Sequence, residues 1–155
     1  QFGSLKGNVE KLKKFESLLK EAEINAELSE DIEKTVWEKF IFISSLATIT
    51  SFADANIGGV LASAEHQKLL VELIAEVSQL AKAKKVNVAE NIEEFTLNRI
   101  KSAPPASTSS MHSDFQKKSK TELETLTGFV VREAKTLNLP TPTYEMIYKD
   151  LTKRN

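Results

Sequence analysis

Lys39 is the residue whose position most suggests chemistry, because it interrupts an apolar stripe on a predicted helix. Ile32, Val36, Ile43 and Ala47 recur at helical spacing and share one face with Lys39. A lysine in such a stripe either extends its ammonium to the rim of the apolar surface or holds it in a cleft. In a cleft it can donate a proton to a bound substrate. The residues alone favour the first alternative.

Three more polar residues are candidates in the second half of the chain. Ser109 and Ser110 precede a predicted helix, where hydroxyls and backbone amides can bind an anion, although a serine-rich surface linker is the simpler interpretation. The segment Ser119-Lys120-Thr121-Glu122 fits a capping box, with Ser119 at the N-cap and Glu122 three residues later. A cap would account for Glu122 without any ligand.

Several functional classes are disfavoured by composition and spacing. His66 and His112 lack carboxylates at ligand spacing, so we expect no metal site. The net charge of −1 predicts no nucleic-acid partner, and the basic run 117–120 is typical of a solvated helix face. The uncharged stretch 40–53 is shorter than the roughly 20 residues that cross a bilayer, which predicts no membrane partner. Cysteine is absent, which is compatible with the cytoplasm, where we expect the protein.

Apolar spacing predicts a mainly α-helical chain of 155 residues. The first two helices are expected to begin at Asn8 and at Ser29, the second extending past Thr50. Others are predicted over about 65–84, 88–100, 119–136 and 143–152, with a turn at 56–59 and a loop at 102–110.

The stretch Phe40–Ala53 is apolar or hydroxyl-bearing on every side, which predicts a helix buried all round. Its hydroxyl groups either bond to carbonyls of their own helix, the favoured alternative, or line a polar pocket in the core. These residues are Ser44, Ser45, Thr48, Thr50 and Ser51.

Residues 1–28 have a different pattern, with the end of a strand, a helix and a short alternating stretch at Ile24, Ala26 and Leu28. One helix and one strand cannot satisfy the hydrogen-bonding edges of that strand. We therefore expect residues 1–28 to be the tail of a parallel-sheet domain, and residues 29–155 to be the helical domain. A first residue of Gln1 rather than Met agrees with this expectation, although no Gly-x-Gly-x-x-Gly loop or Walker lysine is present.

Two stretches of the chain resemble the C-terminal domain of the ketopantoate reductases (2-dehydropantoate 2-reductases). The first is Asp31-Ile32 followed by Trp37-Glu38-Lys39-Phe40. The second runs from Thr108-Ser109-Ser110-Met111-His112-Ser113-Asp114 through Thr121-Glu122-Leu123-Glu124 and Gly128 to Leu139-Pro140-Thr141-Pro142-Thr143. The resemblance covers about residues 31–150. It implies a mainly α fold of the 6-phosphogluconate dehydrogenase C-terminal-like type, preceded by a short α/β stub that ends a Rossmann domain.

The resemblance also implies a function, namely reduction of a 2-keto acid by NADPH in pantothenate biosynthesis, in a cytoplasmic homodimer. Lys39 matches the catalytic general acid of the family. Glu122 matches a glutamate that contacts substrate and cofactor, and Ser110 matches a substrate-binding serine. NADPH would be bound mainly by the chain's own Rossmann domain, so the isolated fragment is expected to be inactive.

This sequence departs from the family at positions around the expected substrate. Established members carry asparagine where this chain has Ile43, Ala47 and Ser107. We place these residues and Ser109 at the substrate, and the loss of amides favours a related, more apolar keto acid. The alternative is a stand-alone all-α interaction module without catalysis, in which Phe40–Ala53 packs against a partner helix. The α/β stub and the paired motifs favour the enzyme.

Overall fold

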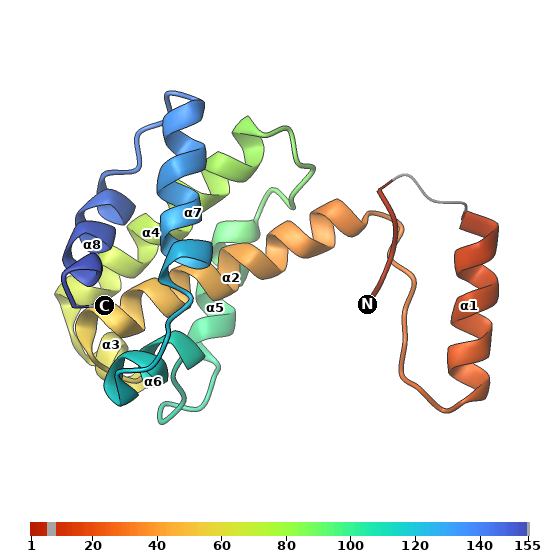
Figure 1. Ribbon diagram of the computed structural model, residues 1–155, viewed down its shortest axis with the longest axis horizontal. Helices are drawn as coiled ribbons and strands as arrows, with labels where there is room; N and C mark the ends of the chain where they lie inside the picture. The colour runs from red at the N-terminus through yellow and green to blue at the C-terminus, as the bar shows by residue number, and fades with distance from the viewer. Residues whose placement is uncertain (6–8, 155) are drawn as a thin grey trace.

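The computed structural model describes residues 1–5 and 9–154 (Figure 1). That part of the chain forms eight helices, which confirms the predicted mainly α fold. In chain order they are α1 (Val9–Glu21), α2 (Ile32–Ala53), α3 (Ile57–Ala62), α4 (Ala64–Ala83), α5 (Ile92–Lys101), α6 (Ser110–Lys117), α7 (Leu123–Thr136) and α8 (Pro142–Thr152).

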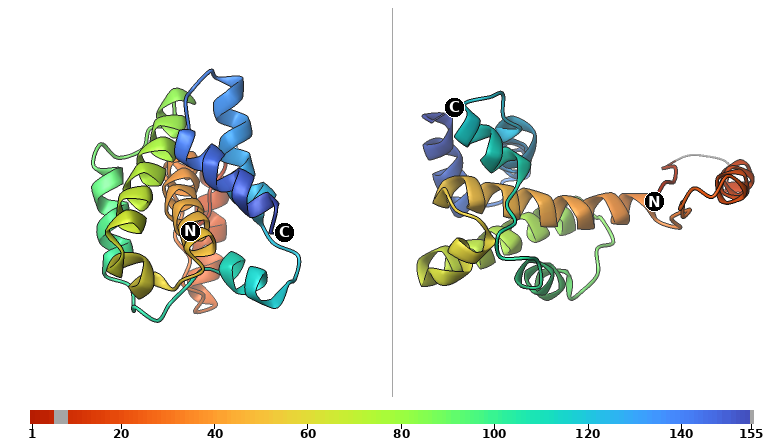
Figure 2. Two further views of the ribbon diagram at one scale, coloured as in Figure 1. Left: turned by 90° about the vertical axis from the view of Figure 1, so that its left-hand side faces the viewer. Right: turned by 90° about the horizontal axis from the view of Figure 1, so that it is seen from below.

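Helix α2 runs through the middle of a helical body, and α1 lies apart from that body at the N-terminal end of α2 (Figures 1 and 2). Helices α4, α5, α6, α7 and α8 all pack against α2. The buried apolar core is drawn from residue 41 onward, and α1 contributes no buried residue to it. The core therefore belongs to the segment after residue 29, as the sequence predicts.

The two ends of the N-terminal segment, before and after α1, meet at one isolated parallel bridge between Phe2 and Leu28. The Phe2 amide donates to the Glu27 carbonyl at 3.0 Å, and the Ser29 amide donates to the Phe2 carbonyl at 2.8 Å. The predicted strand at Ile24–Leu28 is thus limited to a single bridge, and the predicted N-cap, Asn8, lies outside the described residues.

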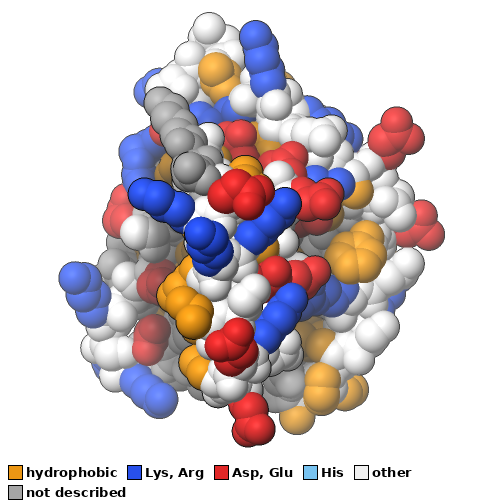
Figure 3. All heavy atoms as spheres, turned by 90° about the vertical axis from the view of Figure 1, so that its right-hand side faces the viewer, with side chains coloured by type: hydrophobic (Ala, Val, Ile, Leu, Met, Phe, Trp, Pro, Cys, Tyr) orange, Lys and Arg blue, Asp and Glu red, His pale blue; other side chains and the backbone are white. Residues whose placement is uncertain are grey.

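The surface of this segment is partly apolar. Leu5 and Leu18 are 73% and 61% exposed, and Figure 3 shows such apolar side chains among mixed acidic and basic ones on the face that carries α1. Assignment of residues 1–28 to a Rossmann domain remains our proposal.

Two predicted element boundaries near α2 are wrong. The helix begins at Ile32 rather than Ser29, because Asp31 is its N-cap and accepts a hydrogen bond from the Lys34 amide at 3.0 Å. Ser29 is instead held by its bond to Phe2. The predicted turn at 56–59 is the start of α3, where the Asn56 side chain caps the helix through the Gly59 amide.

The predicted capping box at Ser119 is also wrong. The Ser119 hydroxyl donates to the carbonyl and carboxylate of Asp114, and α7 begins four residues later at Leu123. Glu122 occupies the N-cap position of α7 but makes no side-chain capping bond. Helix α6 was not predicted, because its N-cap, Ser109, lies inside a stretch of small residues that is typical of loops.

Some of the buried hydroxyls of α2 follow the favoured alternative, and others make bonds to neighbouring helices that were not predicted. Ser45 and Thr50 donate to carbonyls one turn earlier in the helix, each at 2.7 Å. The Ser44 hydroxyl instead lies 2.9 Å from the Tyr144 hydroxyl of α8, and Thr48 lies 2.8 Å from Thr127 of α7. Burial raises the pKa of the Tyr144 phenol far above its ordinary value, so this hydroxyl stays protonated. The Ser44 and Thr48 hydroxyls therefore tie α2 to α8 and α7.

Helix α4 carries a buried carboxylate, Glu76, whose role was not predicted. Glu76 is 8% exposed and accepts hydrogen bonds from the backbone amides of Thr143 at 2.8 Å and Tyr144 at 2.9 Å. These amides belong to the first turn of α8, whose donors have no partner within the helix. A negative charge at a helix N-terminus is also favoured by the macrodipole. Glu76 therefore fixes α8 to α4.

We predict that Glu76→Ala lowers the free energy of unfolding by about 2 to 3 kcal/mol, because two buried amides lose a charged acceptor. Urea unfolding of the chain measures this loss. Glu72→Ala is the matched control on the same helix, since Glu72 reaches α8 only through a 3.3 Å bond to the Thr143 hydroxyl. Equal losses in the two variants would contradict the special role of Glu76.

Candidate functional site

Lys39 lines a pocket of about 580 Å³ between α2 and α5, together with Ile43 and Arg99. The pocket borders the first half of α2, which lies outside the buried core. Within the described residues, the Lys39 ammonium has no ion pair or hydrogen bond. Lys39 is exposed and borders the pocket, so its ammonium is available to a ligand under either of the two alternatives.

Positive charge dominates the lining of this pocket. Glu38 is its one lining carboxylate among the described residues, and one oxygen of Glu38 already accepts from the Ala89 amide at 3.1 Å. The same oxygen lies 4.0 Å from the Lys34 ammonium. The Arg99 guanidinium is stacked over the Phe42 ring at 4.7 Å. Two cations without a carboxylate partner make the pocket suited to a small anion.

Ser110 and Glu122, which belong to the two matched motifs, lie close to each other. The Ser110 hydroxyl is 3.5 Å from a carboxylate oxygen of Glu122, and both residues are exposed. Ser110 opens α6 and Glu122 precedes α7, so both lie at helix N-termini, where backbone amides favour anionic or acceptor groups. Since Glu122 does not cap its helix, its second oxygen is available to a ligand.

An apolar groove connects the surroundings of Lys39 with helix α7. Val36 borders both the Lys39 pocket and this groove. The aromatic rings in the groove are packed edge to face or tilted, at centroid distances of 5.3 to 6.3 Å. The groove is lined by Val36, Trp37, Phe40, Thr125 and Phe129, and Thr125 lies one turn after Glu122. Lys39 itself makes no hydrogen bond to Ser110 or Glu122 in the described chain.

The remaining predicted substrate residues occupy different environments. Ile43 lines the Lys39 pocket, whereas Ala47 is 3% exposed and belongs to the core. The Ser109 hydroxyl accepts from the His112 amide at 3.1 Å and lies 2.8 Å from the Thr50 hydroxyl. Ser107 accepts from the Ile57 amide through its carbonyl, which holds the loop against α3. The substrate roles of all four residues stay predictions.

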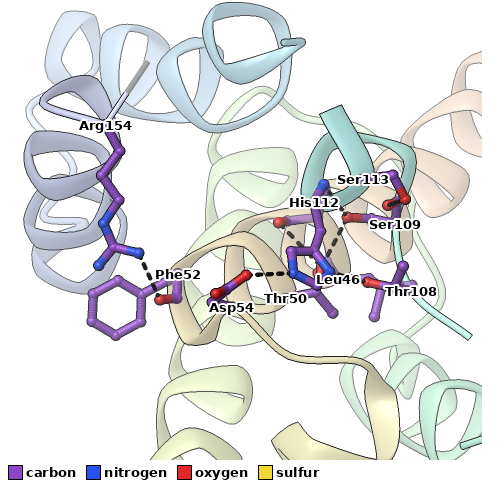
Figure 4. Close-up of polar contacts among 10 residues, drawn as sticks. Leu46, Thr50, Phe52, Asp54, Thr108, Ser109, His112, Ser113 and Arg154 are labelled. Atoms are coloured by element: carbon purple, nitrogen blue, oxygen red, sulfur yellow. Dashed lines mark hydrogen bonds and ion pairs between the residues drawn. The ribbon is translucent and has the colours of Figure 1, made fainter. Parts of the chain in front are cut away.

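A polar cluster at the C-terminal end of α2 was not predicted (Figure 4). The buried imidazole of His112 lies with Nε2 2.9 Å from an Asp54 carboxylate oxygen and with Nδ1 2.7 Å from the Thr108 hydroxyl. A carboxylate can only accept, so Nε2 carries the proton. The hydrogen bond from His112 is the main cause that lowers the pKa of the Asp54 carboxyl. The cluster holds α6, and with it Ser110, against the end of α2.

The described residues contain no group of three or more His, Cys, Asp or Glu side chains that could hold a metal ion. None of the described helices combines the length and the apolar character needed to cross a membrane.

We predict that Asp54→Asn destabilises the chain at neutral pH and that this effect fades in acid. Because the pKa of Asp54 is lowered in the folded state, its carboxylate stabilises the fold at pH values above the ordinary pKa of about 3.9. This stabilisation is lost as the pH falls through the lower pKa of the folded state. Urea unfolding of both proteins between neutral pH and about pH 2 measures the difference. In a His112→Phe background the difference between Asp and Asn should depend much less on pH, since only the weaker effects of Gln116 and Arg154 on the pKa of Asp54 remain. A pH dependence of undiminished size in that background would exclude His112 as its main cause.

Comparisons with known proteins identify a family that the chain matches. Residues 31–155 match the family described as Ketopantoate reductase PanE/ApbA C terminal. The 2-dehydropantoate 2-reductase of Pyrobaculum aerophilum is 31% identical over 127 residues, which is 82% of this chain and 45% of that protein. The chain spans about half the length of the curated relatives that it matches first.

Solved structures share the fold. A dimeric ketopantoate reductase from Staphylococcus aureus superposes with a TM-score of 0.86 at 23% identity, over 96% of this chain and 51% of that one. D-mandelate dehydrogenase with NADH and anilino(oxo)acetate gives a TM-score of 0.83 at 19% identity, over 98% of this chain and 50% of that one. The chain therefore belongs to the ketopantoate reductase PanE/ApbA family, and residues 31–155 are its helical C-terminal domain.

Proposed function

We propose that this chain is the substrate-binding and catalytic half of a cytoplasmic, NADPH-dependent reductase of a 2-keto acid. The observation that carries the proposal is the free Lys39 ammonium in an electropositive pocket, on a chain whose family is that of the ketopantoate reductases. The similarity to 2-dehydropantoate 2-reductases supports an oxidoreductase of this class. The dimeric neighbour from Staphylococcus aureus supports a homodimer.

Lys39 is proposed as the general acid. Reduction of a keto carbon places negative charge on the carbonyl oxygen, and an ammonium directed at that oxygen stabilises the charge and then protonates the alkoxide. Lys39 is exposed to the pocket and is not committed to another side chain among the described residues. Ser110 and Glu122 would orient the substrate, since the Ser110 hydroxyl can donate to an oxygen of a small acid and the Glu122 carboxylate, 3.5 Å from it, can accept from a hydroxyl of the ligand.

The cofactor would be held mainly by a Rossmann domain joined to residues 1–28. Glu122 fits a role toward it, because its exposed carboxylate makes no capping bond and can accept from a cofactor hydroxyl or amide. A nicotinamide cofactor supplies the hydride when it is bound. The chain carries no glycine-rich phosphate-binding turn, so we expect these 155 residues to be inactive by themselves.

The pocket favours an acid more apolar than 2-dehydropantoate. Ile43 presents an apolar side chain to the pocket where an amide would bond a substrate hydroxyl. The fold neighbour that binds anilino(oxo)acetate supports this choice, because that ligand is an aromatic oxo acid. We do not propose the non-catalytic interaction module, because residues 41–51 of its expected binding helix are largely buried by the chain's own helices.

We predict that Lys39→Ala lowers kcat for reduction of the preferred keto acid by about 10²- to 10⁴-fold, because the transition state loses its proton donor. The assay follows NADPH oxidation by the full-length protein with 2-dehydropantoate, 3-methyl-2-oxobutanoate and phenylglyoxylate. Lys34→Ala is the matched control, as Lys34 lies on the same helix and pairs with Glu38 instead of lining the pocket. Turnover retained in Lys39→Ala would contradict the proposed acid, and no reduction of any keto acid would contradict the proposed function.

A further inference from the structure

We infer that Arg99 is the residue that binds the carboxylate of the keto acid, in the same pocket as Lys39. Nothing in the paired sequence motifs marks this arginine, which lies in the last turn of α5. The inference rests on the proposed function, because it names the group that recognises the acidic end of the proposed substrate.

The position of Arg99 is fixed by an aromatic ring. Its guanidinium carbon lies 4.7 Å from the centroid of the Phe42 ring. Phe42 follows Lys39 by three residues, so the two side chains are neighbours on one side of α2. Arg99 and Lys39 therefore line one pocket from two helices. Because its side chain is already held by the ring, Arg99 loses less conformational entropy on binding a ligand than an unrestrained arginine would.

The charges around Arg99 leave it available to a ligand. Within the described residues it forms no ion pair, whereas Arg132 and Arg154 pair with Glu124 and Asp150. An acid that entered this pocket would meet two cations of different kinds, while the one lining carboxylate among the described residues, Glu38, has one oxygen bonded to the Ala89 amide.

The two cations suit the two ends of a 2-keto acid. A guanidinium binds a carboxylate through two parallel hydrogen bonds, which also fixes the plane of the ligand. The keto oxygen lies on the neighbouring carbon, and an ammonium acts there as a point charge and proton donor. With Arg99 holding the carboxylate and Lys39 facing the keto oxygen, the carbonyl would be oriented for reduction. Arg99 would then determine affinity and orientation, and Lys39 the chemical step.

The direct test is binding without turnover. Oxamate, which has a carboxylate beside a carbonyl that is not reduced, is titrated calorimetrically into the full-length protein. We expect Arg99→Ala to weaken binding by about 10- to 100-fold, the effect of one lost charge-assisted bidentate contact. Arg99→Lys should recover part of this loss. Lys101→Ala is the matched control, because it removes a positive charge from the same helix without touching the pocket, and its affinity should equal that of the wild type.

Steady-state kinetics separate carboxylate binding by Arg99 from a role in the chemical step or in cofactor binding. In Arg99→Ala the KM for the keto acid should rise far more than kcat falls, and the amide of the same acid should be reduced equally by variant and wild type. A rise in the KM of NADPH alone would mean that the anion is a cofactor phosphate and would overturn the assignment. Unchanged oxamate binding by Arg99→Ala, in a sample whose melting temperature shows that the variant is folded, would also overturn the assignment. Oxamate binding that depends on Arg99 without turnover of any keto acid would refute the proposed function but keep the anion site.

Discussion

Buried hydroxyl pairs between α2 and its neighbours determine how the rest of this domain is arranged. Thr48 contacts Thr127 of α7, and Ser44 contacts Tyr144 of α8, both within the core. Burying a hydroxyl without a hydrogen-bond partner costs free energy. Each pair therefore restricts the rotation and the axial position of one helix relative to its neighbour. The start of α7, which carries Glu122, is therefore positioned by contacts made deep inside the domain.

Helix α2 changes its environment along its length, and the site lies where that change occurs. Residues from Ile41 onward pack into the core, whereas Val36 and Lys39 face outward. The apolar stripe of this helix thus continues past the edge of the core and forms a wall of a pocket. A lysine in that wall is close to apolar surface without being buried in it, and α5 adds Arg99 from the opposite side. Rigid helices hold both cations, which favours precise orientation of a ligand.

Local patterns in the sequence were sufficient for the long helices, whereas the short helices α3 and α6 were not predicted. Lys39 was detectable because it interrupts an apolar stripe, and the motif around Ser110 and Glu122 brings together residues that do lie within 3.5 Å. Longer-range bonds were not detectable. Glu76 caps a helix 67 residues away, and His112 bonds to a carboxylate 58 residues away, with no local signal for either pairing. The capping box at Ser119 failed because Asp114 offers that hydroxyl two acceptors in a tighter turn.

The most direct test of this account is a crystal structure of the full-length protein with its nicotinamide cofactor and oxamate. The account predicts that the ligand occupies the pocket between α2 and α5, with its carbonyl oxygen at hydrogen-bond distance from the Lys39 ammonium and its carboxylate on Arg99. A ligand bound elsewhere, with Lys39 directed into bulk solvent, would contradict the central claim that this pocket is where the keto acid is reduced.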